Sequence, residues 1–359
     1  MKKMKYKSDK YFNYNEENPR KRHKVNKFIK QKYYNKSYII LILIIIIIIQ
    51  LIINIYTFFT KNNNKSISLI SPGNNEKNNA SFEINNINNN EKIEEIDSNL
   101  LLSIKDRLNG VIEIISNEQK YLNGMVRKFK PKKLVEIGVS GGGTSALMLN
   151  AIKDIPDAKL YSIERRNNWY KDENKKAGWA VEERFPELMN KWTIYAGVNT
   201  AEVIEKIGNN IDFAFIDTVH WCPGEMLNWL EILPFLKEEA VVVFHDAFLM
   251  FFNDRINDRR TINYSNNQLL CYIRGELILP SYGNEVFSRK IGGLKLYKNQ
   301  KNYLKHYFLA LGTQWEYMPE EYDLKILREF YIKYYGEKLV EIYDDAVAKN
   351  KKRWKIIHN

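Results

Sequence analysis

Residues 211–246 read IDFAFIDTVHWCPGEMLNWLEILPFLKEEAVVVFHD. Apolar runs at 211–217 and 240–246 flank a segment, Glu225–Leu236, whose apolar residues recur at helical spacing. A short apolar strand, a helix and a second apolar strand are typical of a βαβ unit, in which the two strands lie parallel and are covered by helices. This stretch therefore predicts an α/β fold built on a parallel sheet.

The same alternation continues toward the amino terminus, where three more apolar runs are separated by helical segments. Strands are predicted at 133–138, 159–164 and 191–197, and helices at Thr144–Lys153, over most of Trp169–Asn190 and at Thr200–Ile207. This order predicts a Rossmann-like, doubly wound and mostly parallel seven-stranded sheet with helices on both faces.

The remaining segments of the folded part have weaker patterns. Residues 284–299 (NEVFSRKIGGLKLYKN) are predicted to form two strands joined by Gly292-Gly293, as an antiparallel hairpin at the sheet edge. Residues 300–359 are predicted to be helical and to pack on the domain. Between Leu100 and Ile115 apolar residues also recur at helical spacing.

A long apolar run, Tyr38–Phe59, precedes the α/β pattern. Its only polar residues without an aromatic ring are Gln50, Asn54 and Thr57, and a helix of this length would reach about 33 Å, enough to cross the hydrocarbon core of a bilayer. The run is long and begins late for a cleaved signal peptide, and it lacks the polar face of a core helix. It therefore predicts a transmembrane helix that contacts membrane lipid.

The charge is concentrated in residues 1–37, which carry +10 of the net +12. The positive-inside rule keeps this tail in the cytosol, which predicts a single-pass type II protein with its catalytic domain lumenal (secretory pathway or Golgi) or extracytoplasmic. The nearly neutral remainder argues against a nucleic-acid partner. The expected organisation is a basic tail (1–37), a transmembrane helix (38–59), a disordered Asn-rich stalk (60–97), a folded domain (98–300) and a helical extension (301–359).

The chain has two cysteines, Cys222 and Cys271. They have no metal-type spacing, and two are too few for a disulfide scaffold. We expect two thiols, with one disulfide as the alternative in an oxidising compartment.

Polar residues end four of the predicted strands: Glu136, Glu164, Asp217, and the pair His245 and Asp246. In open α/β sheets, ligands bind at the carboxyl ends of the strands. These residues therefore predict a functional site at that edge.

A second signal is the stretch LVEIGVSGGGTSAL at 134–147. A glycine turn between a strand and a helix lets the backbone approach a ligand, and the helix amino terminus favours anions. No Gly-Lys-Ser/Thr follows, which excludes a P-loop, whereas a dinucleotide site and an S-adenosylmethionine site both remain open. The strand ends at Ile137, so Gly138 and Gly142 are the positions that shape the turn.

Residues 136–144 (EIGVSGGGT) resemble the first motif of class I S-adenosylmethionine-dependent methyltransferases, E/D-x-G-x-x-x-G-x-S/T. Glu164 lies 22 residues after Gly142, where this family places the acid that holds both ribose hydroxyls. Residues 196–199 (AGVN) resemble the adenine-contacting turn, although the acid or serine often found there is absent. The resemblance implies an S-adenosylmethionine site formed by Glu136, Gly138, Gly142, Thr144, Glu164 and Asp217.

The stretch 211–248 is similar to a methyltransferase subfamily with F-I-D-x-x-H and F-H-D motifs, which is related to metal-dependent O-methyltransferases. The resemblance covers about 131–299. Thr218 and the pair Glu238-Glu239 stand at turns where the subfamily usually has glycine.

The subfamily resemblance implies that Asp217 and Asp246 are oxygen ligands suited to Mg²⁺. Relatives add an Asn or an acid beside the second Asp, where this chain has Ala247. His220 and His245 would complete a site for a softer metal, or one of them would be the general base. The expected catalytic residues are His245, His220 and Asp217.

The leading hypothesis is a membrane-anchored S-adenosylmethionine-dependent methyltransferase that methylates an oxygen of a glycan or small molecule. A lumenal enzyme would need a transporter for this cofactor, which is made in the cytosol. The alternatives are an NAD-dependent oxidoreductase on a similar sheet, since an acid at Glu164 also suits NAD, and an inactive scaffold that keeps the fold.

Overall fold

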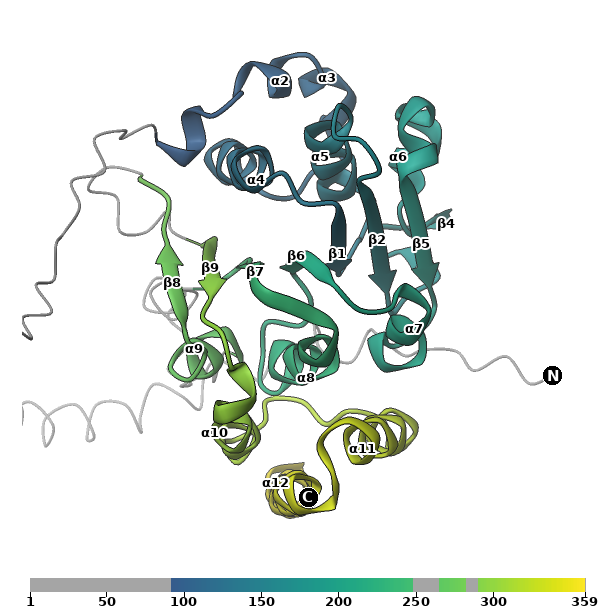
Figure 1. The fold of residues 1–359 in the computed structure, drawn as a ribbon. Helices are drawn as coiled ribbons and strands as arrows, with labels where there is room; N and C mark the ends of the chain where they lie inside the picture. Colours follow the sequence, from purple (N-terminus) through teal and green to yellow (C-terminus); the bar gives the residue numbers. More distant parts are fainter. Residues whose placement is uncertain (1–91, 248–264, 282–289, 359) are drawn as a thin grey trace, which may run out of the picture. The chain divides into compact units, whose positions relative to one another are not determined.

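A seven-stranded sheet lies at the centre of the protein, with the strand order β5-β2-β1-β6-β7-β9-β8 (Figure 1). The first five of these strands are parallel, and β9 is antiparallel to both of its neighbours. The strands are β1 (Lys133–Ile137), β2 (Lys159–Glu164), β5 (Trp192–Ala196), β6 (Ile211–Ile216), β7 (Leu236–Phe244), β8 (Gly275–Ile278) and β9 (Gly292–Leu296). The predicted doubly wound sheet is confirmed, and its order reverses between β1 and β6, where such sheets bind ligands.

This computed structural model describes residues 92–247, 265–281 and 290–358, which belong to one compact unit. The predicted tail (1–37), membrane span (38–59) and most of the stalk lie outside the described residues. Within the described ranges, no helix combines the length and the apolar character needed to cross a bilayer.

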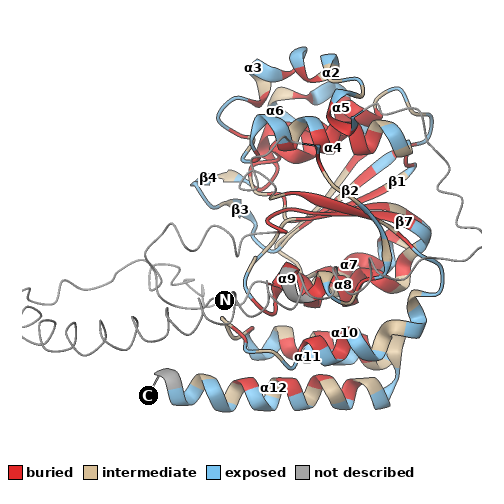
Figure 2. Ribbon diagram, turned by 90° about the vertical axis from the view of Figure 1, so that its left-hand side faces the viewer, coloured by how far each residue is buried: buried red, intermediate tan, exposed pale blue. Residues whose placement is uncertain are grey.

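Helices cover both faces of the sheet, and a further helical layer lies outside one of them (Figure 2). Helices α4, α5 and α6 lie on one face, and α7, α8 and α9 lie on the other, with α10 to α12 stacked beyond them. The helices are α2 (Asn99–Leu102), α3 (Lys105–Leu108), α4 (Ser116–Phe129), α5 (Gly143–Ile152), α6 (Trp179–Arg184), α7 (Thr200–Ile207), α8 (Gly224–Ile232), α9 (Ser265–Leu270), α10 (Leu304–Ala310), α11 (Glu321–Tyr335) and α12 (Glu337–His358). Short 3-10 turns are η2 (Ile93–Glu95), η3 (Pro186–Lys191), η4 (Leu233–Phe235) and η8 (Gln300–Tyr303).

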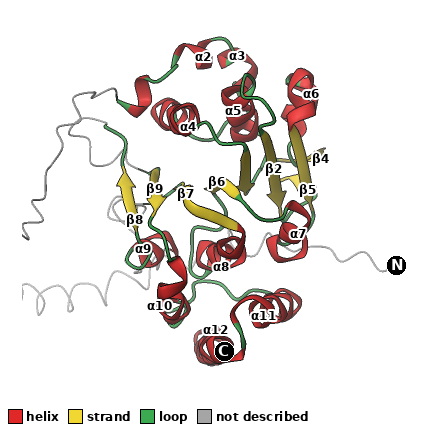
Figure 3. Ribbon diagram, viewed as in Figure 1, coloured by secondary structure: helices red, strands yellow, loops and turns green. Residues whose placement is uncertain are grey.

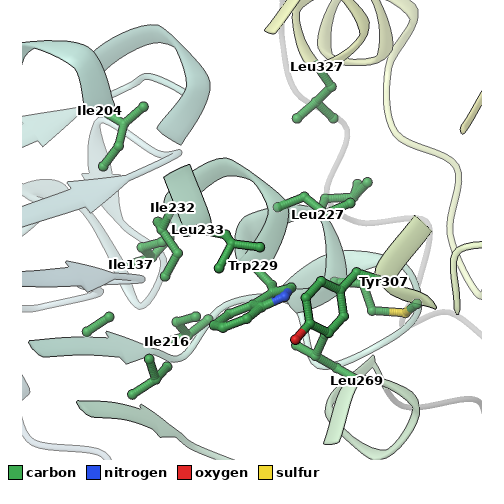
Figure 4. Packing of buried hydrophobic residues seen from close by; sticks show 14 of the residues in the cluster. Ile137, Ile204, Ile216, Leu227, Trp229, Ile232, Leu233, Leu269, Tyr307 and Leu327 are labelled. Atoms are coloured by element: carbon green, nitrogen blue, oxygen red, sulfur yellow. The ribbon is translucent and has the colours of Figure 1, made fainter. Parts of the chain in front are cut away.

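The extension beyond residue 300 is helical, as predicted, and it shares the core of the sheet domain. Trp229 of α8 packs edge-on against Tyr307 of α10, with ring centroids 5.6 Å apart (Figure 4). The Tyr331 hydroxyl of α11 donates to the Leu227 carbonyl oxygen at 3.2 Å. Each fully buried side chain of this size contributes roughly 1.5 to 3 kcal/mol, so the extension is a structural part of the domain.

The segment after β2 differs from the predicted helix over Trp169–Asn190. It forms a hairpin of β3 (Asn168–Trp169) and β4 (Asp172–Lys176), then α6 and η3. The residues 172–176 (DENKK) have no apolar side to bury in a helix, and Pro186 begins η3 directly after α6.

The edge of the sheet also differs from the prediction (Figure 3). Gly292 and Gly293 lie inside β9 rather than in a turn, and β9 pairs with β7 and with β8. A Cβ on Gly293 would lie 2.7 Å from the Met125 methyl carbon and 2.9 Å from the Tyr121 hydroxyl, so side chains of α4 pack closely on this glycine. The other strand of the predicted hairpin falls in 282–289, outside the described residues.

The amino-terminal boundary lies before residue 98, within the predicted stalk. Ile93 and Glu94 are buried, and the Ser281 hydroxyl donates to Glu94 at 2.9 Å. The helical pattern of 100–115 becomes two one-turn helices, α2 and α3, which are separated at Ser103-Ile104, and Asn109-Gly110 ends the second. Cys222 is buried, Cys271 is exposed and no disulfide joins the two, so the alternative of a disulfide is wrong.

Candidate active site

The loop between β1 and α5 forms one side of the site. Gly138 and Gly142 have φ values of +93° and +92°, which glycine adopts without strain. A Cβ on Gly138 would lie 1.8 Å from the carbonyl oxygen of Asp217, so the loops that follow β1 and β6 touch at this point. A Cβ on Gly142 would lie 2.9 Å from Gly178 Cα, so the two glycines singled out in the sequence allow close approach to two different segments.

Glu136 lies beneath this loop and is fully buried. Its carboxylate accepts hydrogen bonds from the hydroxyls of Thr144 (2.6 Å), Ser145 (2.5 Å) and Ser162 (2.6 Å). Burial raises the pKa of Glu136 to about 7, against the opposing effect of the three hydroxyls. Glu136 and Thr144 were both predicted to bind the cofactor. In the structure they hydrogen-bond to each other and support the loop from its buried side.

Glu164 lies where three strand-end loops meet. One carboxylate oxygen accepts from the backbone N–H groups of Val139 (2.9 Å) and Ser140 (3.0 Å) in the glycine loop. The other accepts one hydrogen bond, from Arg166 N at 2.9 Å. Since a carboxylate oxygen can accept two hydrogen bonds, this second oxygen has capacity for a ligand hydroxyl.

Beyond β6 and β7, carboxylates and imidazoles form two rows. In the first, Asp217 Oδ1 lies 3.1 Å from His245 Nδ1, and His245 Nε2 lies 3.4 Å from Glu118 Oε2. In the second, Asp246 Oδ2 lies 3.0 Å from His220 Nε2, and His220 Nδ1 lies 3.1 Å from Glu225 Oε1.

The two rows are joined, because His220 Nε2 lies 3.9 Å from Asp217 Oδ1 and His245 Nδ1 lies 3.6 Å from Asp246 Oδ2. We call the six residues of the two rows the carboxylate–imidazole cluster: Glu118, Asp217, His220, Glu225, His245 and Asp246. The four residues predicted from sequence at the ends of β6 and β7 are thus brought together.

Glu118 and Glu225 are the members that sequence reasoning missed. They come from the first turns of α4 and α8, and both are buried. Three oxygens of the cluster, Glu118 Oε1, Glu225 Oε2 and Asp246 Oδ1, are buried without a hydrogen-bond partner among the described residues. For Glu225 the available signal was a glutamate at the start of the largely apolar helix α8, since charged residues are rarely buried without a partner; Glu118 stands among polar residues and gave no such signal.

Mutual contacts set the charge of the cluster. Burial alone would lower the pKa of His220, but hydrogen bonds to Asp246 and Glu225 outweigh it and raise the pKa to about 10. Burial would likewise lower the pKa of His245, but the charge of Asp217 and its hydrogen bond outweigh this effect. The pKa of His245 therefore lies well above its ordinary value. Both shifts favour the protonated, imidazolium form of the two rings.

This arrangement does not fit the metal site implied for Asp217 and Asp246. One oxygen of each carboxylate is already paired with an imidazole, Asp217 Oδ1 with His245 and Asp246 Oδ2 with His220. Ala247, where an extra ligand would stand, is buried and offers none. Among the residues that the structure describes, no group of three or more His, Cys, Asp or Glu side chains is arranged to hold a metal ion.

Residues 135–247, from β1 to the end of β7, match a family model described as a methyltransferase domain. This match confirms, for residues 135–247, the superfamily expected from the sequence motifs. No sequence among the curated proteins matches the chain.

Solved structures of methyltransferases resemble the chain at low identity. The O-methyltransferase TomG of Streptomyces achromogenes, in complex with SAM, is 16% identical, with 55% of this chain and 88% of that chain covered and a TM-score of 0.39. The O-methyltransferase from Bacillus cereus, in complex with SAH, is 11% identical, with 55% and 89% covered and a TM-score of 0.40. The SAH-bound Podospora anserina methyltransferase PaMTH1 is 14% identical, with 55% and 87% covered and a TM-score of 0.39.

Proposed function

We propose that the protein binds S-adenosylmethionine along the edge formed by the glycine loop and Glu164, and transfers its methyl group to an oxygen of a small-molecule or glycan acceptor. One observation carries this proposal. The glycine loop and the carboxylate–imidazole cluster meet where the strand order reverses, at the backbone contact between Gly138 and Asp217. A cofactor held on the loop would thus face groups able to take up a proton.

Different residues of this edge would contact the cofactor or support the loop that contacts it. The free accepting capacity of Glu164 suits a ribose hydroxyl, and the backbone of the glycine loop allows close approach. Glu136 and Thr144 act as positioning residues, because their mutual hydrogen bond fixes the start of α5 beneath the loop. When bound, S-adenosylmethionine supplies an electrophilic methyl group on a sulfonium.

The cluster faces the acceptor. The acceptor oxygen forms a bond to the methyl carbon as the carbon–sulfur bond breaks, and the acceptor's proton passes to the cluster. His220 is the more open imidazole, with 30% of its side chain exposed against 11% for His245. We assign proton uptake to the neutral form of His220, whose share grows as the pH rises toward 10, while His245 and Asp217 orient the ring from the neighbouring row.

The surface beside His220 suits a ring-bearing acceptor. Trp221 exposes 41% of its surface, although its backbone is fixed by the Ser265 hydroxyl, which donates to the Trp221 carbonyl oxygen at 2.9 Å. An exposed indole held next to the proton acceptor can stack on a phenol or a sugar ring.

Titration calorimetry of the full chain with S-adenosylhomocysteine (SAH) tests the cofactor. We expect saturable binding, and we expect Glu164→Gln to weaken it about tenfold, since the variant loses a charged acceptor of a ligand hydroxyl. Glu183→Gln, in an exposed pair with Lys175, is the matched control and should bind as the wild type does. Absence of binding at millimolar SAH would refute the proposal, and saturable NAD binding would favour an oxidoreductase.

We propose in addition that Tyr38–Phe59 anchors the protein in a membrane with the domain on the lumenal or extracytoplasmic side. The support is the sequence alone: an apolar run of spanning length follows a strongly basic tail. In sealed vesicles the domain should resist added protease and become sensitive after detergent. Digestion before detergent would place the domain on the cytosolic side, where S-adenosylmethionine is made.

A further inference from the structure

The helical extension, which lies outside the matched methyltransferase domain, reaches the carboxyl edge of the sheet. Asp323 in the first turn of α11 makes this contact. Its Oδ1 accepts hydrogen bonds from Arg165 Nη2 at 2.9 Å and from Asn199 Nδ2 at 2.8 Å. Figure 2 shows α11 in the outer helical layer, on the side of the sheet covered by α7 and α8.

The two partners of Asp323 belong to two different strand-end loops. Arg165 directly follows Glu164 at the end of β2, and Asn199 ends the turn after β5 and begins α7. These loops also touch through the backbone, because the Glu164 carbonyl oxygen accepts from Gly197 N at 2.9 Å. The two loops are thus joined twice, by this backbone hydrogen bond and by the side chain of Asp323.

The position of this junction follows from the strand order β5-β2-β1. Along the edge, the glycine loop follows β1, Glu164 ends β2 and the turn 196–199 follows β5. If Glu164 holds the ribose, the methionine side of the cofactor lies toward β1 and the base lies toward β5. The turn 196–199 (AGVN) has no charged side chain of its own. Two acids hold its last residue: Glu202 accepts from Asn199 N at 2.7 Å, and Asp323 accepts from Asn199 Nδ2 at 2.8 Å.

The carboxylate of Asp323 is better shielded from solvent than an ordinary surface acid, so its hydrogen bonds are expected to be stronger. Only 16% of its side chain is exposed, whereas Asp344, which pairs with Arg328 elsewhere in the extension, is 41% exposed. Exposed ion pairs contribute little, and shielding from solvent strengthens hydrogen bonds to a charged acceptor. Separate contacts hold α11 on α7, including Tyr322 OH to Glu202 Oε1 at 3.0 Å and Lys333 Nζ to Glu205 Oε1 at 2.6 Å.

We propose that Asp323 is a positioning residue for the nucleoside part of the cofactor, supplied by the extension to the methyltransferase domain. It fixes the turn 196–199 relative to Glu164, so that ribose and base are bound by one rigid edge. This inference rests on the proposed function. It gives the extension a role in cofactor affinity beyond its packing on α8.

Calorimetry with SAH on the full chain tests this role. Asp323→Ala should raise the dissociation constant roughly tenfold, and Asp323→Asn, which keeps an accepting oxygen but loses the charge, should raise it less. If an acceptor is available, the KM for S-adenosylmethionine should rise while kcat at saturation stays within about twofold. A purely structural role would not produce this separation.

Two control variants distinguish positioning from general docking of the extension. Lys333→Met removes a contact of α11 with α7 at Glu205, away from the turn 196–199, and Asp344→Ala removes an ion pair inside the extension, so both should bind SAH as the wild type does. Unchanged affinity in both Asp323 variants, or an equal loss in the controls, would overturn the inference alone. If the wild type itself fails to bind SAH, the proposed function fails and this inference fails with it.

Discussion

Replacing His220 by alanine is expected to lower the rate of methyl transfer by about 10²- to 10⁴-fold, the range typical of a lost general base. The affinity for SAH should stay within about twofold, since His220 contacts acidic partners beyond β6 and β7 rather than the glycine loop. The rate is measured as SAH formed with the best acceptor from a panel of phenols and sugars. His306→Ala is the matched control, because His306 stacks on Tyr272 and is not part of the cluster.

The pH dependence gives this prediction a second readout. Because the pKa of His220 is raised to about 10, the ring is protonated at pH 7, and the rate should increase as the pH rises toward 10. Glu225→Gln removes one of the carboxylates that raise this pKa, so the rising limb should move to lower pH. A rate that is flat between pH 6 and 10 would show that His220 is not the proton acceptor.

The raised pKa of His220 also contributes to the stability of the folded protein, and it does so at the pH values where the ring is protonated. The folded protein holds the His220 proton more tightly than the unfolded chain does, so the contribution is complete below pH 6.5 and is lost as the pH rises through about 10. Ring signals of His220 followed by NMR against pH would report this pKa without any acceptor, which separates the charge of the cluster from its chemistry.

The sequence predicted the parts of the fold that depend on local patterns. The five parallel strands, the helices between most of them and the polar residues that end those strands follow from short apolar runs and their order. The hairpin β3–β4 and the glycines inside β9 did not follow, because contacts with other segments decide them. Trp169 of the hairpin donates its indole N–H to Ser140 at 3.1 Å, and Met125 of α4 packs closely on Gly293.

The site shows the same division between local and distant information. Asp217, His220, His245 and Asp246 follow two apolar strands and were identified as candidates. Glu118 and Asp323 were not, since they contact the site from helices 127 and 158 residues away in the chain from His245 and Arg165. Glu225 is only five residues from His220, but its role depends on the turn that directs it back toward the ring.

The second large effect is expected for Gly138→Ala. A φ of +93° is unfavourable for alanine, and its Cβ would lie 1.8 Å from the Asp217 carbonyl oxygen, so the loops after β1 and β6 would have to separate. We expect a loss of about 2 to 5 kcal/mol in the free energy of unfolding, from backbone strain and overpacking together. Binding of SAH should be lost as well, because the glycine loop and the cluster share this contact.

Gly336→Ala separates the two causes in this prediction. Gly336 has a φ of +79°, but among the described residues a Cβ there would meet no atom within 4 Å. Its substitution should cost only the backbone strain, about 1 to 2 kcal/mol, and leave SAH binding intact. Denaturant unfolding of both variants measures the difference. Equal losses would mean that Asp217 does not approach Gly138 closely, and the link between the cofactor loop and the proton-accepting cluster would have to be given up.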